Sequence, residues 1–155
     1  MRPVSAADNR QQCEAAGKRW VSQVGACANK IAIPLRKVGK SYMIAGVIGG
    51  GGMPVDFTLD TGAELVCLPD RMVYRLIALG LLVPDDFIGQ SRMRSADGAT
   101  RTARRFILRS LVVGDQNVHQ VEASDGCGEP LLGQSFLGVF NSYHIDNKHQ
   151  TLVLD

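Results

Sequence analysis

The sequence has no long hydrophobic run and no large excess of charge of either sign. Its longest apolar stretch, residues 76–83, is far shorter than the roughly 18 residues of a membrane-spanning helix. Seventeen Lys and Arg residues against 15 Asp and Glu residues give a net charge of +2, which argues against binding nucleic acid by bulk charge. The first residues, MRPVSAADNRQQC, lack the apolar segment of a signal peptide, so we expect a cytoplasmic protein or a trimmed mature form.

Common metal and cofactor motifs are absent as well. The cysteines, at positions 13, 27, 67 and 127, form no C-x-x-C pair, which argues against a zinc ribbon or a thioredoxin-like site. The glycines at 49–52 are followed by neither a Lys-Ser/Thr pair nor a helical pattern, so they indicate a hairpin turn rather than a phosphate-binding loop. The three histidines lie far apart in the sequence. We therefore expect neither a metal nor a cofactor.

The first 30 residues differ from the rest of the chain in their pattern of polar and apolar residues. Residues 6–17 are typical of a helix, and Cys13 and Cys27 bracket a polar segment with too few apolar side chains for a core of its own. A disulfide between them would stabilise this loop by about 3 kcal/mol and indicate an oxidising compartment; two free thiols are the alternative. We divide the chain into a cysteine-containing segment, residues 1–30, and one domain, residues 31–155.

Strand patterns dominate the domain. Residues 91–108 predict two strands joined at Ala96-Asp97-Gly98, because Asp-Gly is a strong hairpin-turn signal. Helices are expected at 69–82, with a stop at Gly80, and from Gln134 onward. The other expected strands lie at 30–38, 41–49, 54–60, 109–113, 118–123 and in a pair within 143–154. The sequence predicts an all-β, or mainly β, domain with one or two short helices.

The most informative stretch is FTLDTGAELVCLP, residues 57–69. Asp60 ends an apolar strand and is followed by Thr61 and Gly62, small residues that allow a tight turn with the carboxylate at the bend. A carboxylate backed by apolar packing is costly unless backbone groups bind it or a second group shares its proton, so the position indicates a function. The alternative is an ordinary turn residue, as in many Asp-x-Gly sequences.

Two motifs resemble those of the retropepsin-like aspartic proteases, in particular their bacterial single-domain branch. TLDTGA at residues 58–63 is similar to the family's hydrophobic-hydrophobic-Asp-Thr-Gly-Ala signature. LLGQSFL at residues 131–137 is similar to its second mark, an apolar pair and a glycine that lead into a short helix. The resemblance covers residues 30–155 and leaves the cysteine-containing segment unexplained. It implies a closed, barrel-like sheet with a flap hairpin.

The resemblance also implies a mechanism. Peptide hydrolysis by two aspartates needs one carboxylate to take a proton from water and a protonated one to donate to the scissile carbonyl. This sequence has a single Asp-Thr-Gly, so the second Asp60 must come from another copy, and the active enzyme is expected to be a homodimer. By the same resemblance Thr61 bonds across the dimer, Gly62 admits the substrate backbone and Ala63 contacts substrate.

Further substrate contacts follow from the resemblance. The turn of Ala96, Asp97 and Gly98 corresponds to the tip of the flap that closes over substrate. Leu131, Leu132 and Gly133 correspond to part of the wall of the site.

The predicted hairpin carries six arginines against one acidic residue: Arg92, Arg94, Arg101, Arg104, Arg105 and Arg109. Solvated outward faces are the simplest interpretation, and a preference for acidic or polar substrate flanks is the alternative; the aromatic residues of a nucleic-acid site are missing.

In the family's fold the strands near Cys67 and Cys127 run close together, so the resemblance allows a second disulfide there; two buried free thiols are the alternative.

We expect an aspartic endopeptidase with a protein or peptide substrate and no nucleic-acid partner. It would be periplasmic or otherwise exported, perform limited proteolysis of envelope or surface proteins, and have an N-terminal anchor outside this chain. The alternatives are a non-catalytic dimerisation or binding module, a latent protease covered by residues 1–30, and a redox protein built on the cysteines.

Overall fold

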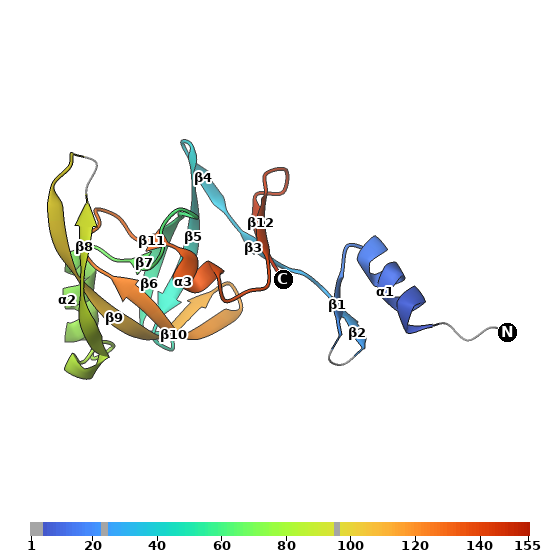
Figure 1. The fold of residues 1–155 in the computed structure, drawn as a ribbon, viewed down its shortest axis with the longest axis horizontal. Helices are drawn as coiled ribbons and strands as arrows, with labels where there is room; N and C mark the ends of the chain where they lie inside the picture. The colour runs from blue at the N-terminus through green and yellow to red at the C-terminus, as the bar shows by residue number, and fades with distance from the viewer. Residues whose placement is uncertain (1–4, 23–24, 95–96) are drawn as a thin grey trace. The chain divides into compact units, whose positions relative to one another are not determined.

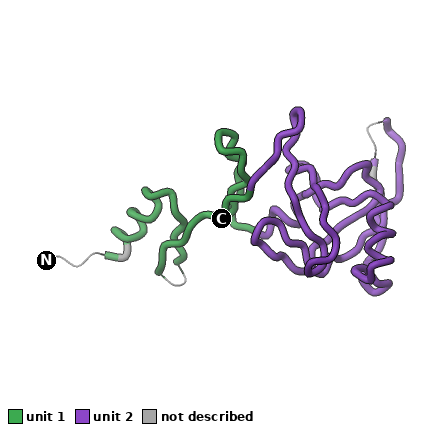
Figure 2. Tube along the Cα trace, turned by 180° about the vertical axis from the view of Figure 1, so that it is seen from behind, with its two compact units in different colours: residues 1–33, 140–155 green, residues 34–139 purple. Residues whose placement is uncertain are grey.

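The structure, a computed structural model, describes residues 5–22, 25–94 and 97–155 (Figure 1). By its internal contacts the chain forms two compact units, residues 1–33 together with 140–155, and residues 34–139 (Figure 2). The larger unit contains the Asp-Thr-Gly motif. The division expected at residue 30 stays a prediction. In the described ranges, no helix has the length and apolar character needed to cross a membrane.

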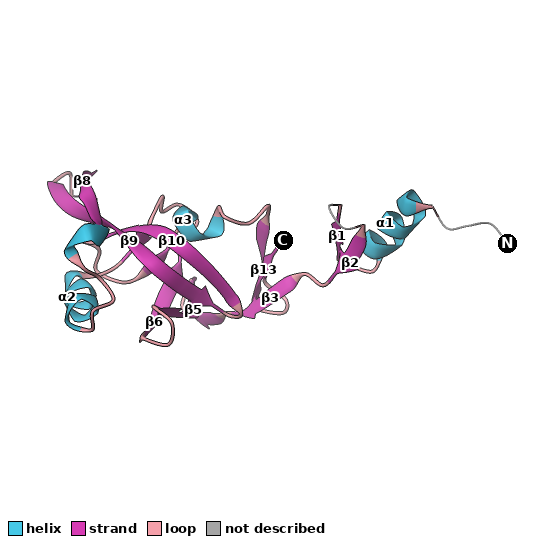
Figure 3. Ribbon diagram, turned by 90° about the horizontal axis from the view of Figure 1, so that it is seen from below, coloured by secondary structure: helices cyan, strands magenta, loops and turns pink. Residues whose placement is uncertain are grey.

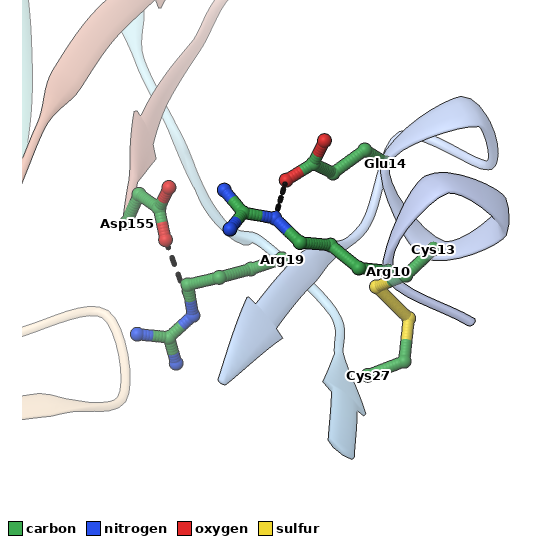
Figure 4. The surroundings of a disulfide bond; sticks show 6 residues. All are labelled: Arg10, Cys13, Glu14, Arg19, Cys27 and Asp155. Atoms are coloured by element: carbon green, nitrogen blue, oxygen red, sulfur yellow. Dashed lines mark hydrogen bonds and ion pairs between the residues drawn. A yellow bond between two sulfur atoms is a disulfide. The ribbon is translucent and has the colours of Figure 1, made fainter. Parts of the chain in front are cut away.

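The smaller unit begins with a polar helix that a disulfide ties to a short hairpin. Helix α1 (Ala6–Ala15) starts with a capping box in which Asp8 N–H donates to the Ser5 hydroxyl and Ser5 N–H donates to the Asp8 carboxylate. Hydrogen bonds from the Ser5 hydroxyl and backbone lower the pKa of Asp8. Cys13 on this helix is bonded to Cys27, so the expected first disulfide is present (Figure 4).

The strands of the smaller unit form two separate sheets. In the antiparallel hairpin, β1 (Arg19–Val21) pairs with β2 (Ala26–Ala28), and Cys27 lies in β2. The three-stranded sheet has the order β12-β13-β3 and consists of β12 (Tyr143–Asp146), β13 (Thr151–Leu154) and β3 (Ile31–Pro34). Arg19 forms an ion pair with Asp155 at 3.2 Å, and Arg10 forms one with Glu14 at 2.9 Å along α1 (Figure 4). The predicted C-terminal strand pair is therefore present, whereas the hairpin inside the cysteine loop was not expected.

The larger unit is built on one eight-stranded sheet that closes on itself. Its order is β4-β5-β6-β11-β7-β10-β9-β8, and β5 pairs with β9 as well as with β6, so the strands from β5 round to β9 form a ring. The strands are β4 (Arg36–Val38), β5 (Ser41–Ile48), β6 (Met53–Leu59), β7 (Val66–Cys67), β8 (Phe87–Arg94), β9 (Thr100–Val113), β10 (Gln116–Ser124) and β11 (Leu131–Leu132). The prediction of a mainly β, closed sheet is confirmed.

Alternation of side chains places the core inside this ring. Along β6, Met53, Val55 and Phe57 are buried, whereas the intervening Pro54 and Asp56 are exposed, which is the period of a half-buried strand. The long strands β9 and β10 pair side by side over most of their length (Figure 3). The largest side chains with no exposed surface are Phe57, Phe106 and Phe136, which lie on β6, on β9 and after β11.

Helix α2 (Asp70–Ala78) connects β7 to the strands that follow. It is amphipathic, with Val73 and Leu76 buried. It ends before Gly80, whose φ of +72° is a conformation that favours glycine, and Leu81 N–H then donates to Leu76 O at 2.9 Å. The short 3₁₀ helix η1 (Pro84–Asp86) leads into β8. The helix expected at 69–82 is thus present in a shorter form.

Three expectations about element boundaries need correction. The single strand expected at 30–38 is divided into β3 and β4, which belong to different sheets. Residues 109–113 were expected as a strand of their own, but β9 runs unbroken from Thr100 to Val113 because it pairs with β8, β10 and β5 at different points along its length. The helix expected from Gln134 is only the four-residue α3 (Gln134–Leu137), which ends at Gly138. The predicted hairpin turn at 49–52 is present, and Gly52 N–H donates to Gly49 O there.

Candidate active site

Asp60 lies directly after β6, where that strand pairs with β11. The two strands run parallel, with Leu131 beside Thr58 and Leu132 beside Leu59. The Asp60 N–H continues this pattern and donates to Leu132 O at 3.1 Å. The structure therefore brings the Asp-Thr-Gly motif and the Leu-Leu-Gly motif side by side.

The turn after β6 holds the Asp60 carboxylate by one backbone hydrogen bond and is closed by a second bond to the Asp60 carbonyl oxygen. Gly62 N–H donates to Asp60 Oδ1 at 3.0 Å, and Ala63 N–H donates to Asp60 O at 3.2 Å. Asp60 is half-buried, whereas Thr61 and Gly62 are exposed. The carboxylate is thus fixed at an open turn, where it can accept a proton from a water molecule or, once protonated, donate one to a bound group.

Gly133 is the position at which the two motifs pack most tightly. A Cβ atom added at this residue would lie 2.4 Å from Leu65 O and 2.6 Å from Ala63 O, both of which are backbone atoms. No side chain fits at these distances without moving the loop that follows Asp60. The glycine of the Leu-Leu-Gly motif therefore sets the approach of β11 to that loop.

The start of α3 binds the carbonyl groups of the same loop. Gln134 N–H donates to Ala63 O at 2.8 Å, and Ser135 N–H donates to Glu64 O at 3.0 Å. The Gln134 side chain reaches further and donates from Nε2 to Thr61 O at 2.7 Å. These positioning roles were missed from sequence, although both residues lie inside the LLGQSFL run that carried the resemblance.

The Ser135 hydroxyl completes this set, because it accepts a hydrogen bond from Val66 N–H at 2.8 Å. The loop between β6 and β7 is thus held along its length, from Thr61 near one end to Val66 at the other. Backbone groups that an irregular loop would otherwise leave unpaired are satisfied by one short helix. The result is a carboxylate on a rigid support.

A cavity of about 350 Å³ extends from this loop toward the hairpin of β8 and β9. Of the predicted site residues, Ala63 and Leu131 line it. The other lining residues are Glu64, Leu65, Cys67, Ser91, Arg92, Arg105 and Ser124. Arg105 forms an ion pair with Glu122, whereas Glu64, in the loop after β6, and Arg92, on β8, are exposed charged residues of the lining. The arginines were noted from sequence, but sequence alone did not place Arg92 and Arg105 beside the signature loop, as we call residues 60–65 between β6 and β7.

The family is settled by sequence comparison. The sequence model of a family described as "gag-polyprotein putative aspartyl protease" matches residues 44–139, which include both motifs. The chain belongs to this family. No curated protein sequence matches the chain. The predicted identity as a retropepsin-like aspartic protease is thereby confirmed.

A solved structure supports the fold of this protease. The crystal structure of a retropepsin-like aspartic protease from Rickettsia conorii is similar to 82% of this chain and to 99% of its own length, with a TM-score of 0.62 and 23% sequence identity. At that identity the likeness bears on the fold alone. The closed sheet expected from the resemblance agrees with it, and the enzyme class of aspartic endopeptidase follows from the family.

The remaining predicted site residues of the protease lie apart from its cavity. Leu132 and Gly133 are buried beneath the loop after Asp60 rather than in the cavity wall. Asp97 and Gly98 are exposed at the turn between β8 and β9, where Ala99 N–H donates to Asp97 Oδ1 at 3.0 Å. Ala96 lies outside the described residues.

A second disulfide of the protease joins Cys67 to Cys127. Cys67 ends β7, shortly after the signature loop, and Cys127 lies in the segment between β10 and β11. This is the bridge that the resemblance allowed, so both candidate disulfides are present. Within the described residues, no group of three His, Cys, Asp or Glu side chains is placed to hold a metal ion.

Proposed function

We propose that this protease hydrolyses peptide bonds as a homodimer, in which each protomer supplies one Asp60 carboxylate. The observation that carries the proposal is a single carboxylate, fixed by Gly62 N–H at an open turn, in a chain with one Asp-Thr-Gly. Acid-base hydrolysis by carboxylates needs two such groups with opposite protonation states. A twofold axis beside Asp60 supplies the second one without any further residue of the same chain.

The two carboxylates share one proton, because like charges at close range do not both ionise. The ionised Asp60 takes a proton from water while the water oxygen bonds to the scissile carbonyl carbon. The protonated Asp60 of the other protomer gives its proton to the carbonyl oxygen. The first Asp60, now protonated, gives that proton to the amide nitrogen as the carbon–nitrogen bond breaks. The second Asp60, now ionised, takes a proton from a hydroxyl of the diol intermediate as the carboxylic acid product forms, so the pair returns to its starting state.

The residues around Asp60 take supporting roles in this scheme. The exposed Thr61 hydroxyl bonds across the dimer and holds the two loops in register, and the exposed Gly62 admits the substrate backbone. Ala63 and Leu131 contact a substrate side chain, since both line the cavity of about 350 Å³ beside the signature. Leu132 and Gly133 support the loop that carries Asp60, because both lie against its backbone.

The hairpin of β8 and β9 acts as the flap. Its turn, Ala96-Asp97-Gly98, closes over the bound peptide and excludes water from the reacting bond. Support for this role is positional: Ser91, Arg92 and Arg105 of the hairpin line the same cavity as Ala63. A substrate side chain in that cavity touches both the signature loop and the hairpin.

The two disulfides favour an oxidising compartment, because such bonds are rare in proteins of the reducing cytosol. We therefore propose that the protease is exported, for example to the periplasm, and that its substrates are envelope or surface proteins. Residues 1–30, with the first disulfide, form a segment separate from the protease domain of residues 31–155.

The test compares two aspartates of β6 and its following turn. Cleavage of a diverse peptide mixture by the wild type, Asp60→Asn and Asp56→Asn is measured by mass spectrometry at high protein concentration. Asp56 is a matched control, because it is exposed on β6 and forms an ion pair with the exposed Arg36 at 3.5 Å. We expect Asp60→Asn to lose at least about a thousandfold in rate and Asp56→Asn to be unchanged. Equal cleavage by all three proteins would overturn the assignment, and no cleavage by any of them would favour a non-catalytic or latent form.

A further inference from the structure

A second and larger cavity, of about 630 Å³, lies against the β8–β9 hairpin. Its walls are the first turn of α2, the part of the hairpin nearer its turn, and the segment that follows β10. Four of its lining residues are arginines, namely Arg71, Arg94, Arg101 and Arg104. Its acidic lining residues are Asp70 and Asp125. The lining charges are therefore unbalanced in favour of cations.

One of these arginines is fixed by its surroundings. Arg104 Nε lies 2.6 Å from Asp125 Oδ2, and Arg104 N–H donates to Asp125 Oδ1 at 2.7 Å. The guanidinium group also lies over the rings of Tyr74 and Phe87, 5.3 and 5.7 Å from their centroids. Asp125 is buried, and both of its carboxylate oxygens accept hydrogen bonds from Arg104. The negative charge of Asp125 is therefore paired with Arg104 in the wall of the cavity.

With Arg104 and Asp125 matched to each other, three cations face one acidic group. Arg71, Arg94 and Arg101 are exposed, and Asp70 is the acidic residue that remains beside them. They come from two elements, since Arg71 lies on α2 while Arg94 and Arg101 lie on the two strands of the hairpin. Guanidinium groups that two elements contribute to the lining of one cavity suit carboxylates, which accept paired hydrogen bonds from them.

The arginine-lined cavity and the cavity beside the signature loop have residues in their linings that are neighbours in the chain or bonded to each other. Arg104 lines the larger cavity and its neighbour Arg105 lines the smaller one. In the same way Cys127 lines the larger cavity and its disulfide partner Cys67 lines the smaller one. A peptide with one side chain in the smaller cavity can thus place residues farther along its chain against the arginines.

We propose that the larger cavity is a subsite for acidic side chains in the segment of substrate that flanks the scissile bond. The inference rests on the proposed function, because it assigns part of that enzyme's substrate. A nucleic acid is a weaker match, since Tyr74 is the aromatic residue of the lining and single strands bind on rows of aromatic side chains. Asp70, which lines the cavity beside Arg71, also opposes a continuous phosphate backbone.

The test is a binding measurement on the Asp60→Asn protein, so that it does not depend on cleavage. The probes are two fluorescein-labelled heptapeptides, Ala-Glu-Ala-Glu-Ala-Glu-Ala and its counterpart with Gln in place of Glu, followed by fluorescence anisotropy. We expect the Glu peptide to bind about tenfold more tightly at low salt, and the ratio to shrink as ionic strength rises. Such a result stands whether or not Asp60 proves to be catalytic.

Matched variants locate the binding site. Arg71→Gln combined with Arg101→Gln is expected to bring the ratio of the two affinities close to one, and Arg94→Gln alone to reduce it. Arg75→Gln is the control, because Arg75 is exposed one turn farther along α2 and does not line the cavity. Circular dichroism of each variant checks that it is folded.

Three results would overturn the inference. The first is equal affinity for the Glu and Gln peptides at low salt. The second is a preference for the Glu peptide that the double variant retains, which would place the binding site elsewhere. An equal loss of that preference in Arg75→Gln and in the double variant counts in the same way, because it would show an effect of net charge. The third is an unlabelled ten-nucleotide single-stranded DNA that binds in an Arg71- and Arg101-dependent manner more tightly than the Glu peptide.

Discussion

The loop that carries Asp60 and the hairpin of β8 and β9 are held in different ways. The loop is fixed along its length by hydrogen bonds from β11 and α3, and by the close approach of Gly133 to its carbonyl groups. The part of the hairpin nearer its turn, residues 90–94 and 100–104, is held by the pairing of its two strands with each other and by the pair of Arg104 and Asp125. Its residues near the turn, Asp97 and Gly98, are exposed.

The difference agrees with the two roles proposed above, a fixed catalytic carboxylate in the loop and a flap in the hairpin. A catalytic carboxylate has to be placed to within a fraction of an ångström, which a fully hydrogen-bonded loop achieves. A lid has to open and close, which requires few fixed contacts. The Cys67–Cys127 disulfide lies between the two cavities that adjoin these regions, so it links their supports.

Removing that disulfide is expected to have the largest effect on stability. Cys67→Ala combined with Cys127→Ala opens a loop with a sequence separation of 60, which costs about 4 kcal/mol of unfolding free energy in the chain-entropy model. Urea unfolding followed by far-UV circular dichroism measures the loss. The control is Cys13→Ala with Cys27→Ala, whose effect should be seen in the fluorescence of Trp20, the single tryptophan, which lies in the smaller unit. A larger effect of the control on the β-sheet signal would contradict the account.

Gly133→Ala tests the rigidity of the Asp60 loop. The added methyl group would meet two backbone carbonyl oxygens, so we expect unfolding free energy to fall by about 3 kcal/mol and peptide cleavage to be lost. Gly128→Ala is the matched control in the nearby segment, since its new methyl group would meet nothing within 4 Å, and it should change stability by less than about 1 kcal/mol. Denaturant titration of both variants decides the matter, and equal stabilities would refute the packing argument.

Asp125→Asn tests the anchor of the hairpin. It removes a charged acceptor from Arg104 in a buried position, and we expect a loss of about 2 kcal/mol in unfolding free energy. Asp56→Asn changes an exposed ion pair with Arg36 and should cost less than about 0.5 kcal/mol. Thermal unfolding of the two variants under the same buffer conditions gives the comparison. If both variants lose the same amount, the hairpin has no special anchor at Asp125.

The smallest expected effect is that of Gln134→Ala. It deletes the hydrogen bond from Gln134 Nε2 to Thr61 O, for which we expect about 1 kcal/mol of stability. Because that bond positions the turn beside Asp60, kcat should fall while KM changes little. Gln90→Ala, at an exposed position on β8, is the control. A fall in KM alone, with kcat preserved, would contradict a positioning role.

Sequence patterns predicted the Asp60 region better than the hairpin for a physical reason. The Asp60 turn is closed by a short-range hydrogen bond from Gly62 N–H, and the approach of Gly133 to the loop requires a glycine. Both constraints leave recognisable residue types in the two motifs that carried the resemblance. The hairpin turn at Asp97-Gly98 was predicted by the same kind of local signal, and β8 and β9 do flank it. The placement of Arg92 and Arg105 beside the signature loop depends on how the ribbon packs, which no local pattern records.

Short elements and long-range pairing account for the other differences. Strands β7 and β11 contain two residues each, so they have no alternation from which a strand can be recognised. The continuity of β9 past Arg109 comes from partners that lie far away in sequence, namely β5 and β10. Both disulfides remained open alternatives at the level of sequence, because cysteine spacing alone does not fix which thiols pair.

The most direct test of the central claim is subunit mixing. Wild-type and Asp60→Asn chains are combined in different ratios at constant total concentration, allowed to exchange, and assayed for cleavage of one peptide. If each active site needs Asp60 from two protomers, only wild-type pairs cut, and an equimolar mixture retains about a quarter of the wild-type rate. Loss of activity on dilution should accompany this curve. A rate that falls in direct proportion to the wild-type fraction, with half of it left at equimolar mixing, would show that one chain acts alone and would contradict the account.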